Sequence, residues 1–484
     1  MVRRLRSEYR EQYDWFTWCD DAMARRMSAE RGALLQRLAA RVEIGCNGTK
    51  LDCRRLSPGC RCCAAGAWSC LFVNGICDAG CFFCPAEQRD IGQPITNGLT
   101  FSAPEAYLEY LVLGGFSGVA FSGGEPLRTG SRTIAFMRAV RRRFGDRIYL
   151  WMYTNGRLVS EEWLRRLHDE GLDELRFNIV SSGYDLGKVL LAGRFITRIT
   201  IEIPAIPEDE PFLAGRLEAM GDAGVAHLNL HQLRLTPYNA RRFRGRPYTM
   251  LHGEKATVLE SELAALRILE AAQDLPSAPA VNYCSHVYKH RFQGAGMRVI
   301  AARLIRKGWE DITANGYLRR LEMRCAPDLA APVAAALEQA ALPAGTWIMN
   351  RPGVVLFAGV AWDHLRAALC EPAAAGERAA VPRTMDGASE FSRNLMEQCR
   401  FFVSYDAAAI RSSLSFKTMF TELRLTEDHS VYVERLEVLK HVSLTPAGVT
   451  SLMAGESPCP VPDHGGGIAL CSCEHIPAGL AEYY

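Results

Sequence analysis

Between residues 70 and 235, short apolar runs alternate with segments whose apolar positions recur at helical spacing. Short apolar runs favour strands, and apolar positions at helical spacing favour amphipathic helices. Their alternation is typical of a parallel sheet with crossover helices. The pattern therefore predicts an α/β protein built on a partial (β/α)6 barrel, with strands at 70–75, 118–124, 147–156, 174–182, 198–207 and 227–235.

The pattern changes on either side of this region. Residues 1–44 have the Arg-, Glu- and Leu-rich pattern of one or two amphipathic helices, residues 45–69 read as irregular, and beyond residue 300 the alternation loosens. The later segment mixes an Ala-rich helix with strand-like runs, which predicts an α+β domain that caps the barrel and defines the substrate. The expected parts are an N-terminal helical segment (1–45), a Cys-rich segment (46–72), the partial barrel (73–300) and the C-terminal domain (301–484).

Unusual residues follow several predicted strands directly. In parallel barrels, catalytic residues collect at the carboxyl ends of the strands. Those ends carry a cysteine-rich loop, Gly123–Gly124–Glu125–Pro126, Thr154–Asn155–Gly156 and Ser181–Ser182. We therefore expect the site of chemistry at this end of the barrel.

Composition and charge set wider limits. The 484 residues carry a net charge of +2, which gives no global attraction to nucleic acid or to an anionic membrane. No apolar stretch is long enough to span a bilayer, and the basic N-terminus lacks the apolar core of a signal peptide. We therefore expect a cytoplasmic protein that binds no membrane.

The cysteines are unevenly placed along the chain. Of 17 cysteines, nine crowd residues 46–84, a distribution that favours metal binding or catalysis in a reducing compartment. Cys77, Cys81 and Cys84 have the spacing C-x3-C-x2-C. Three thiolates on so short a loop can bind one four-iron cubane, each through a different iron, and leave the fourth iron open to a small molecule.

The cysteine spacing, the aromatic Phe83 before the third cysteine and the later "SGGEP" resemble the radical S-adenosylmethionine (SAM) superfamily. Segments "LNLHQLRLTPYN" and "VNYCSHVYKHRFQGAGMR" resemble uncharacterised relatives of the pyruvate formate-lyase activating enzyme, and the likeness covers roughly residues 50–300. The resemblance implies a [4Fe-4S] cluster whose open iron binds SAM, an electron donor of the flavodoxin or ferredoxin type, and reductive release of a 5′-deoxyadenosyl radical. It also implies cofactor contacts by Phe83, Gly123, Gly124, Glu125, Pro126, Thr154, Asn155, Asn178 and Ser181.

The cysteines upstream of this loop suggest a second metal centre. We predict an auxiliary [4Fe-4S] cluster bound by Cys53, Cys60, Cys63 and Cys70; a structural zinc or plain reduced thiols are the alternatives. The pairs Cys60-x2-Cys63 and Cys81-x2-Cys84 also fit a four-cysteine zinc template, but that reading leaves Cys77 and "SGGEP" unexplained. A third site near the C-terminus would use Cys459, Cys471 and Cys473 with His464 and His475.

Two further segments have open interpretations. In 281–298, Cys284 is a predicted catalytic residue, as a ligand or hydrogen donor, with cations that could hold a carboxylate; the alternative is an amphipathic helix. The loop 238–247 mixes arginines with aromatics, which suits RNA phosphates, although a solvated loop is favoured. We therefore expect hydrogen abstraction from a peptide or small natural-product precursor. The alternatives are an activase, an RNA-modifying enzyme, or a zinc-stabilised nucleic-acid-binding module.

Overall fold

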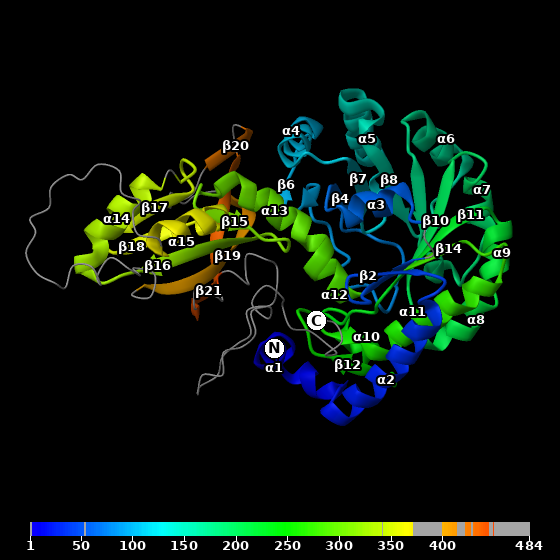
Figure 1. Cartoon of the computed structure of the whole chain (residues 1–484). Helices are drawn as coiled ribbons and strands as arrows, with labels where there is room; N and C mark the ends of the chain where they lie inside the picture. Colours follow the sequence, from blue (N-terminus) through cyan, green and yellow to red (C-terminus); the bar gives the residue numbers. More distant parts are fainter. Residues whose placement is uncertain are drawn as a thin grey trace, which may run out of the picture.

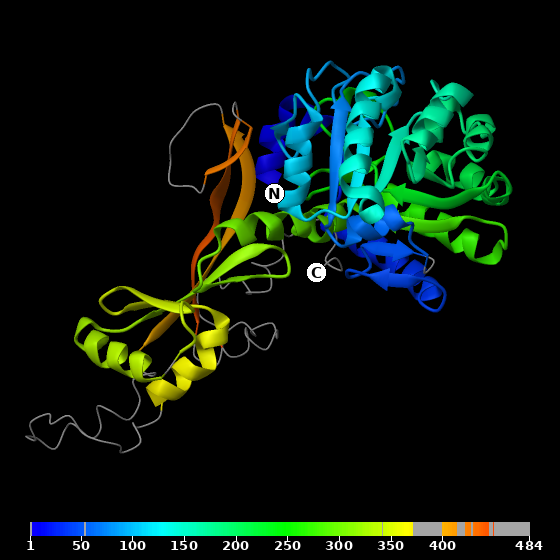
Figure 2. The same ribbon diagram turned by 90° about the horizontal axis from the view of Figure 1, so that it is seen from above.

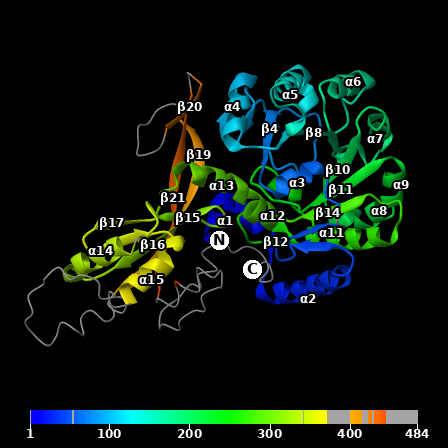
Figure 3. The same ribbon diagram turned by 45° about the horizontal axis from the view of Figure 1, so that its top comes forward.

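The computed structural model describes residues 2–52, 55–340, 342–370, 399–413, 422–426, 429–444 and 449. In this part of the chain, a curved α/β half lies beside a smaller half made of an antiparallel sheet and two helices (Figure 1). Helix α13 (Gly294–Ile305) runs from the first half to the second (Figure 3). Cys53 and the C-terminal site proposed at Cys459, Cys471 and Cys473 lie outside the described residues.

Seven parallel strands of the described chain form the larger half. They stand side by side in chain order, and helices between consecutive strands cover their outer face (Figure 1). This confirms the predicted α/β fold with a partial barrel. The strands are β4 (Trp68–Asn74), β7 (Gly118–Gly123), β8 (Tyr149–Thr154), β9 (Glu174–Phe177), β10 (Arg198–Pro204), β11 (Val225–His231) and β14 (Ala280–Cys284).

The helices between these strands begin and end at ordinary signals. Helix α6 begins after Ser160, whose hydroxyl accepts a hydrogen bond from the Trp163 amide, and α4 ends at Gly115 in the left-handed region. The outer helices are α4 (Pro104–Gly114), α5 (Gly130–Phe144), α6 (Glu161–Asp169), α7 (Gly187–Ala192), α8 (Glu210–Ala214), α9 (Leu217–Asp222) and α11 (Leu259–Ala271).

Strand β14 corrects the helical interpretation of its segment. The helical alternative for 281–298 is wrong for its first four residues, and holds from α12 (His286–Tyr288) through a π-helical turn (Lys289–Gln293) into α13. Val281 and Tyr283 pack into the main core, whereas Asn282 lies on the opposite, inner face. A strand this short with a polar inner face does not have the apolar run expected of a parallel strand.

The segment read as irregular, 45–69, also contains regular structure. Strands β2 (Glu43–Gly45) and β3 (Lys50–Asp52) extend the sheet antiparallel beyond β14, and β5 (Ile95–Thr96) with β6 (Leu99–Thr100) extends it beyond β4. Helix α3 (Pro58–Ala64) is capped by Ser57 and packs against the inner face of the barrel. An added Cβ at Gly59 would meet Arg176 at 2.4 Å, so glycine permits this close approach.

The two faces of the parallel strands have opposite character. Their outward side chains, such as Val119, Leu150 and Leu228, form one apolar core with the covering helices. Their inward side chains are polar or aromatic, among them Tyr153, Arg176, Glu202, Asn229 and Asn282. The interior of the barrel is therefore polar, unlike a hydrophobic core that serves stability alone.

The N-terminal segment closes the barrel on the side of the cysteine loop. The prediction of helices there is confirmed by α1 (Val2–Tyr9) and α2 (Asp21–Leu38). Leu5, Tyr9 and Tyr13 share a core with Phe243, and Phe82 and Phe83 pack against it. The small elements here are β1 (Thr17–Trp18), α10 (Ala240–Phe243), β12 (Thr249–Leu251) and β13 (Thr257–Val258).

The C-terminal half has its own antiparallel sheet and core, as the predicted α+β character requires. Its long strands β19 (Arg400–Ser413) and β21 (His429–Leu444) pair with each other and extend toward the barrel (Figure 2), and β19 contacts α13 while β20 (Glu422–Thr426) contacts α4. In the described part of the chain, no helix combines the length and apolar character needed to cross a bilayer. The elements are β15 (Glu310–Ile312), β16 (Tyr317–Arg324), α14 (Ala330–Gln339), β17 (Trp347–Arg351), β18 (Val354–Phe357), α15 (Trp362–Cys370), β19 (Arg400–Ser413), β20 (Glu422–Thr426) and β21 (His429–Leu444).

Candidate functional site

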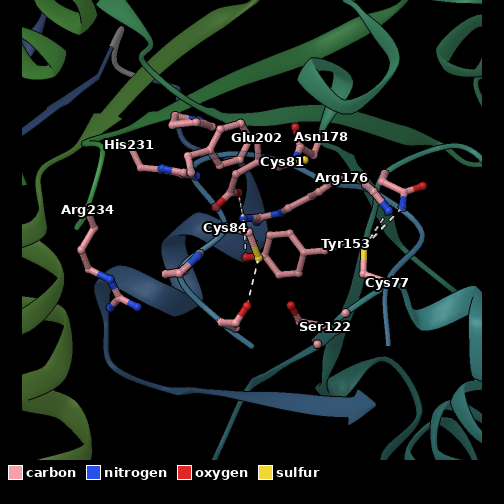
Figure 4. Close-up of a pocket in the computed structure, with 18 of the residues that line it drawn as sticks. Cys77, Cys81, Cys84, Ser122, Tyr153, Arg176, Asn178, Glu202, His231 and Arg234 are labelled. Atoms are coloured by element: carbon pink, nitrogen blue, oxygen red, sulfur yellow. Dashed lines mark hydrogen bonds and ion pairs between the residues drawn. The ribbon is translucent and has the colours of Figure 1, made fainter. Parts of the chain in front are cut away.

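A cavity of about 590 Å³ opens at the carboxyl ends of the parallel strands. Its volume lies in the range of small-molecule sites in proteins. Cys77, Cys81 and Cys84 line it from the loop after β4, and Figure 4 shows Cys77 on one side with His231 and Arg234 on the other. The three thiols predicted as ligands of the first cluster therefore share one cavity.

The cysteine loop is held to the strand end beside it. The Ala79 amide donates to the Cys77 sulfur at 3.4 Å, and the Asn155 side-chain nitrogen reaches Cys77 Sγ at 3.7 Å and Asp78 Oδ1 at 2.7 Å. Burial, together with the neighbouring thiols of Cys84 and Cys77, raises the pKa of the Cys81 thiol to about 11. A positive centre bound at this loop would be needed to ionise this thiol at neutral pH.

Residues 236–248 support the loop from the other side. Asn239 is fully buried, and its side-chain nitrogen donates to the carbonyl of Phe83 at 3.1 Å. Arg242 donates to the carbonyl of Cys81 at 3.2 Å, and the Arg246 guanidinium lies 3.6 Å from the centre of the Phe82 ring. Several side chains of this basic segment thus contact the cysteine loop.

The "SGGEP" motif shapes the adjoining wall. Gly123 has φ +128°, and an added Cβ would lie 2.1 Å from the Asn74 carbonyl, so only glycine fits without strain. Gly124 is equally tight against the Ile76 carbonyl. Both glycines line the cavity, whereas Glu125 and Pro126 are buried behind it.

Glu125 joins two strand ends from behind the cavity wall. Its carboxylate accepts hydrogen bonds from the Leu127 amide at 3.1 Å, the Thr154 hydroxyl at 3.0 Å and the Asn155 amide at 2.7 Å. Burial raises the pKa of Glu125 to about 7, against the opposing effect of these three donors. Glu125 thus fixes the positions of Thr154 and Asn155, which do line the cavity.

The remaining residues expected to contact the cofactor differ in accessibility. Phe83 and Asn178 line the cavity, and the side-chain oxygen of Asn178 is buried with no hydrogen-bond partner among the described residues. Ser181 instead donates to the backbone carbonyls of Asn155 and Asn178. An acceptor without a partner beside three thiols suits a ligand that carries donors.

The inner strands supply a charged wall whose residues Arg176 and Glu202 the sequence pattern did not reveal. Arg176 donates to Glu174 at 2.9 Å and to Glu202 at 2.8 Å. Arg234 and Lys289 also line the cavity, and neither side chain has a hydrogen-bond or ion-pair partner within the described residues. The sequence did carry a signal for this wall: polar residues at every second position of the predicted strands, which places them on one face of the sheet.

The histidines on this wall are neutral at physiological pH. Burial, together with the nearby charge of Lys289 and, at His286, of Arg234, lowers the pKa of His231 and of His286 to about 3. They therefore add hydrogen-bonding capacity to the cavity without adding charge.

The upstream cysteines do not gather as the sequence suggested. Cys60 and Cys63 lie on one side of α3, near Cys284 at the end of β14. Cys70 lies on β4, where its thiol is close to Ser122 and lines a separate cavity beside α13. Among described residues, no three Cys, His, Asp or Glu side chains converge closely enough to hold a single metal ion.

Comparison with known proteins indicates the class of enzyme. Residues 71–192 match the family model of the radical SAM superfamily. MJ0021 of Methanocaldococcus jannaschii, whose name describes it as a candidate glycyl-radical enzyme activating enzyme, is 29% identical over 279 residues; the match covers 55% of this chain and 73% of that protein. Residues 71–192 therefore form a radical SAM domain, and the chain is an enzyme that resembles an activating enzyme.

Two solved structures illustrate the likeness. The radical SAM methyltransferase TsrM of Kitasatospora setae, with tryptophan and a SAM analogue bound, is 15% identical with a TM-score of 0.29, over 42% of this chain and 45% of that one. SuiB of Streptococcus suis, bound to SAM, is 12% identical with a TM-score of 0.29, over 35% and 41%. The match spans less than half the length of each of these structures, and scores this low support no argument.

The residues present fit the cofactors that the superfamily implies. Three thiols on one loop match the donor set of a cluster whose thiolates bind separate irons. The tight backbone at Gly123–Gly124 and the unpartnered oxygen of Asn178 offer polar contacts to SAM beside them. A [4Fe-4S] cluster and SAM are therefore the expected cofactors of this cavity.

Proposed function

We propose that the enzyme cleaves SAM reductively at the Cys77–Cys81–Cys84 loop and abstracts hydrogen from a small-molecule or peptide substrate that carries an anionic group. One observation carries the proposal: a single cavity has the three thiols on one wall and, on another, two cations that have no partner among the described residues. When bound and reduced, the cluster supplies the electron that breaks a carbon–sulfur bond of SAM.

The chain's own residues hold and orient the reactants. Cys77, Cys81 and Cys84 would anchor the cluster, and the Asn155 amide beside Cys77 would stabilise its thiolate. The backbone at Gly123 and Gly124 would receive the amino acid part of SAM. Surrounding strands and the N-terminal segment limit the access of water, which protects a reactive radical.

The substrate wall favours a negative charge. Arg234 and Lys289 line the cavity without partners among the described residues, whereas Glu202 is already paired with Arg176. Because unpaired cations in a partly desolvated cavity are costly, a substrate carboxylate or phosphate would stabilise them. A peptide or a small natural-product precursor satisfies this requirement. An electron donor of the flavodoxin or ferredoxin type remains part of the proposal.

A second candidate function rests on the similarity to MJ0021, which covers most of that protein. In that case the hydrogen would come from a glycine of a partner enzyme. An RNA substrate is less favoured, because Arg242 and Arg246 of the basic loop contact the cysteine loop.

The test uses protein purified and reconstituted without oxygen. With dithionite and SAM, the wild type should form 5′-deoxyadenosine and carry acid-labile sulfide matching its iron; stoichiometric zinc without sulfide would contradict the proposal. Deuterated candidate substrates should then transfer deuterium into 5′-deoxyadenosine. Lys289→Met should raise KM for an anionic substrate about tenfold while leaving KM for SAM unchanged.

Equal deuterium transfer from neutral and anionic substrates would remove the role given to the cations. Transfer only from a deuterated glycine of a partner protein would favour the activase.

A further inference from the structure

Four cysteines from three separate elements lie near one another inside the barrel. Cys60 and Cys63 come from α3, Cys284 from the end of β14, and Cys46 from the turn between β2 and β3. The side-chain nitrogen of Asn282 lies 3.9 Å from Cys60 Sγ and 3.7 Å from Cys284 Sγ. Burial raises the pKa of Cys46, Cys60 and Cys63, and the nearby Cys284 raises each further.

The surroundings of these thiols are polar rather than apolar. The Asn229 amide nitrogen lies 3.2 Å from Cys60 Sγ, and the Asn282 side-chain oxygen accepts a hydrogen bond from the Lys50 ammonium. The Asn282 nitrogen donates to Asn229 Oδ1 at 3.1 Å, and its second hydrogen is left for the Cys60 and Cys284 sulfurs. A buried structural cysteine usually behaves as a small hydrophobe, so packing alone does not explain two amide donors directed at its sulfur. Such donors stabilise thiolates bound to a metal.

The turn that carries Cys46 has an unusual backbone conformation and lies beside Cys284. Cys46 and Asn47 have φ of +52° and +55°, a region that residues other than glycine rarely adopt. The Ser285 amide donates to the Thr49 carbonyl at 3.0 Å, and Lys50 lies directly opposite Cys284 in the sheet. The turn is therefore tied to the end of β14, beside Cys284. Strain of this kind is concentrated at functional sites.

We propose that Cys46, Cys60, Cys63 and Cys284 hold a second [4Fe-4S] cluster inside the barrel. This inference deepens the iron–sulfur chemistry of the proposed function and rests on it. It replaces the ligand set expected from the sequence, because Cys70 lies on β4, at the other end of the seven parallel strands from β14, and Cys53 is outside the described residues.

Two features favour a cluster over zinc. The donors are all thiols, which suit zinc or iron–sulfur centres, but in the described chain they do not converge on the single point that one ion needs. A cubane binds each thiolate through a different iron and so accepts a wider arrangement. Cys284 also lines the main cavity, so this cluster would face the bound substrate. With four thiolates it has no open iron, and SAM should not alter its spectrum.

The test counts iron in variants that remove one centre at a time. The wild type should bind about eight irons, and Cys77→Ala/Cys81→Ala/Cys84→Ala should keep about four, with a reduced paramagnetic signal unchanged by SAM. Cys60→Ser/Cys63→Ser should lose that signal, keep about four irons and still form 5′-deoxyadenosine. Cys62→Ala is the matched control on α3, because its thiol faces Ser117 instead, and it should keep all the iron.

The triple loop variant keeps the inference testable even where interior variants fold poorly. It leaves the four interior cysteines intact, so any cluster it binds must use other ligands than the loop. A triple variant without iron, or with stoichiometric zinc, would overturn the second cluster. A wild type that binds iron and fails to cleave SAM would instead overturn the proposed function and leave this inference standing.

Discussion

The two groups of cysteines in this enzyme are built in opposite ways. The Cys77–Cys84 loop takes its three thiols from one short segment and is stabilised largely by hydrogen bonds to backbone carbonyls. The interior group takes Cys60 and Cys284 from elements far apart in sequence, and the buried ion pairs of Arg176 lie beside it. The first arrangement can form locally; the second requires the folded barrel. We therefore expect loop changes to affect chemistry and interior changes to affect stability.

The largest effect should follow from Cys81→Ala. Removing one of three thiolates leaves the cluster without its third anchor, so 5′-deoxyadenosine formation under dithionite should fall at least about a thousandfold, to background. The free energy of unfolding, measured by urea titration of the protein without iron, should change by less than about 1 kcal/mol, because the thiol is only half-buried. Cys62→Ala should retain both activity and stability. Undiminished product from Cys81→Ala would remove the loop from the mechanism.

Arg176→Met tests the interior side of the comparison. The substitution leaves Glu174 buried without its cation and takes from Glu202 its partner at 2.8 Å. Loss of one member of a buried ion pair costs about 3–5 kcal/mol, and urea unfolding should show a decrease of that size. Arg138→Met breaks an exposed pair with Glu170 and should leave the urea unfolding midpoint almost unchanged. Equal losses in the two variants would contradict the distinction between loop and interior.

The same distinction explains what the sequence could predict. The loop spacing, the glycines of "SGGEP" and six of the strands are local patterns, and the fold they predicted is confirmed. The contact between Cys60 and Asn229 spans 169 residues, so spacing could not reveal it. β14 was missed because its inward positions are polar, and Cys70 was grouped with Cys60 only because it is near in sequence. The roles of the site residues remain predictions.

Glu125 lies between the two regions, and its raised pKa predicts how the stability of the protein depends on pH. Its pKa rises from the usual 4.5 to about 7 in the folded protein, so the folded state holds the proton more tightly than the unfolded state. Stability from this group is therefore full below pH 4.5 and is lost as pH rises through 7. The stability of the wild type relative to Glu125→Gln should fall by roughly 3 kcal/mol between pH 4.5 and 8. Glu87→Gln, at an exposed position, should follow the wild type. A difference independent of pH would show that the carboxylate stays ionised, held by its three donors.

The smallest effect is expected at Asn239, which supports the cysteine loop from below. Its buried side chain donates to the carbonyls of Phe83 and Arg234 and accepts from the Thr236 amide at 2.7 Å. Asn239→Ala leaves these groups without partners, at a cost of about 1–3 kcal/mol. Because part of that cost loosens the loop, iron release to a chelator should accelerate about tenfold. Arg242→Ala removes an exposed bond to the same loop, at the Cys81 carbonyl, and should change the rate less than about twofold. If both variants released iron at the wild-type rate, the thiols alone would hold the cluster and residues 236–248 would have no part in positioning it.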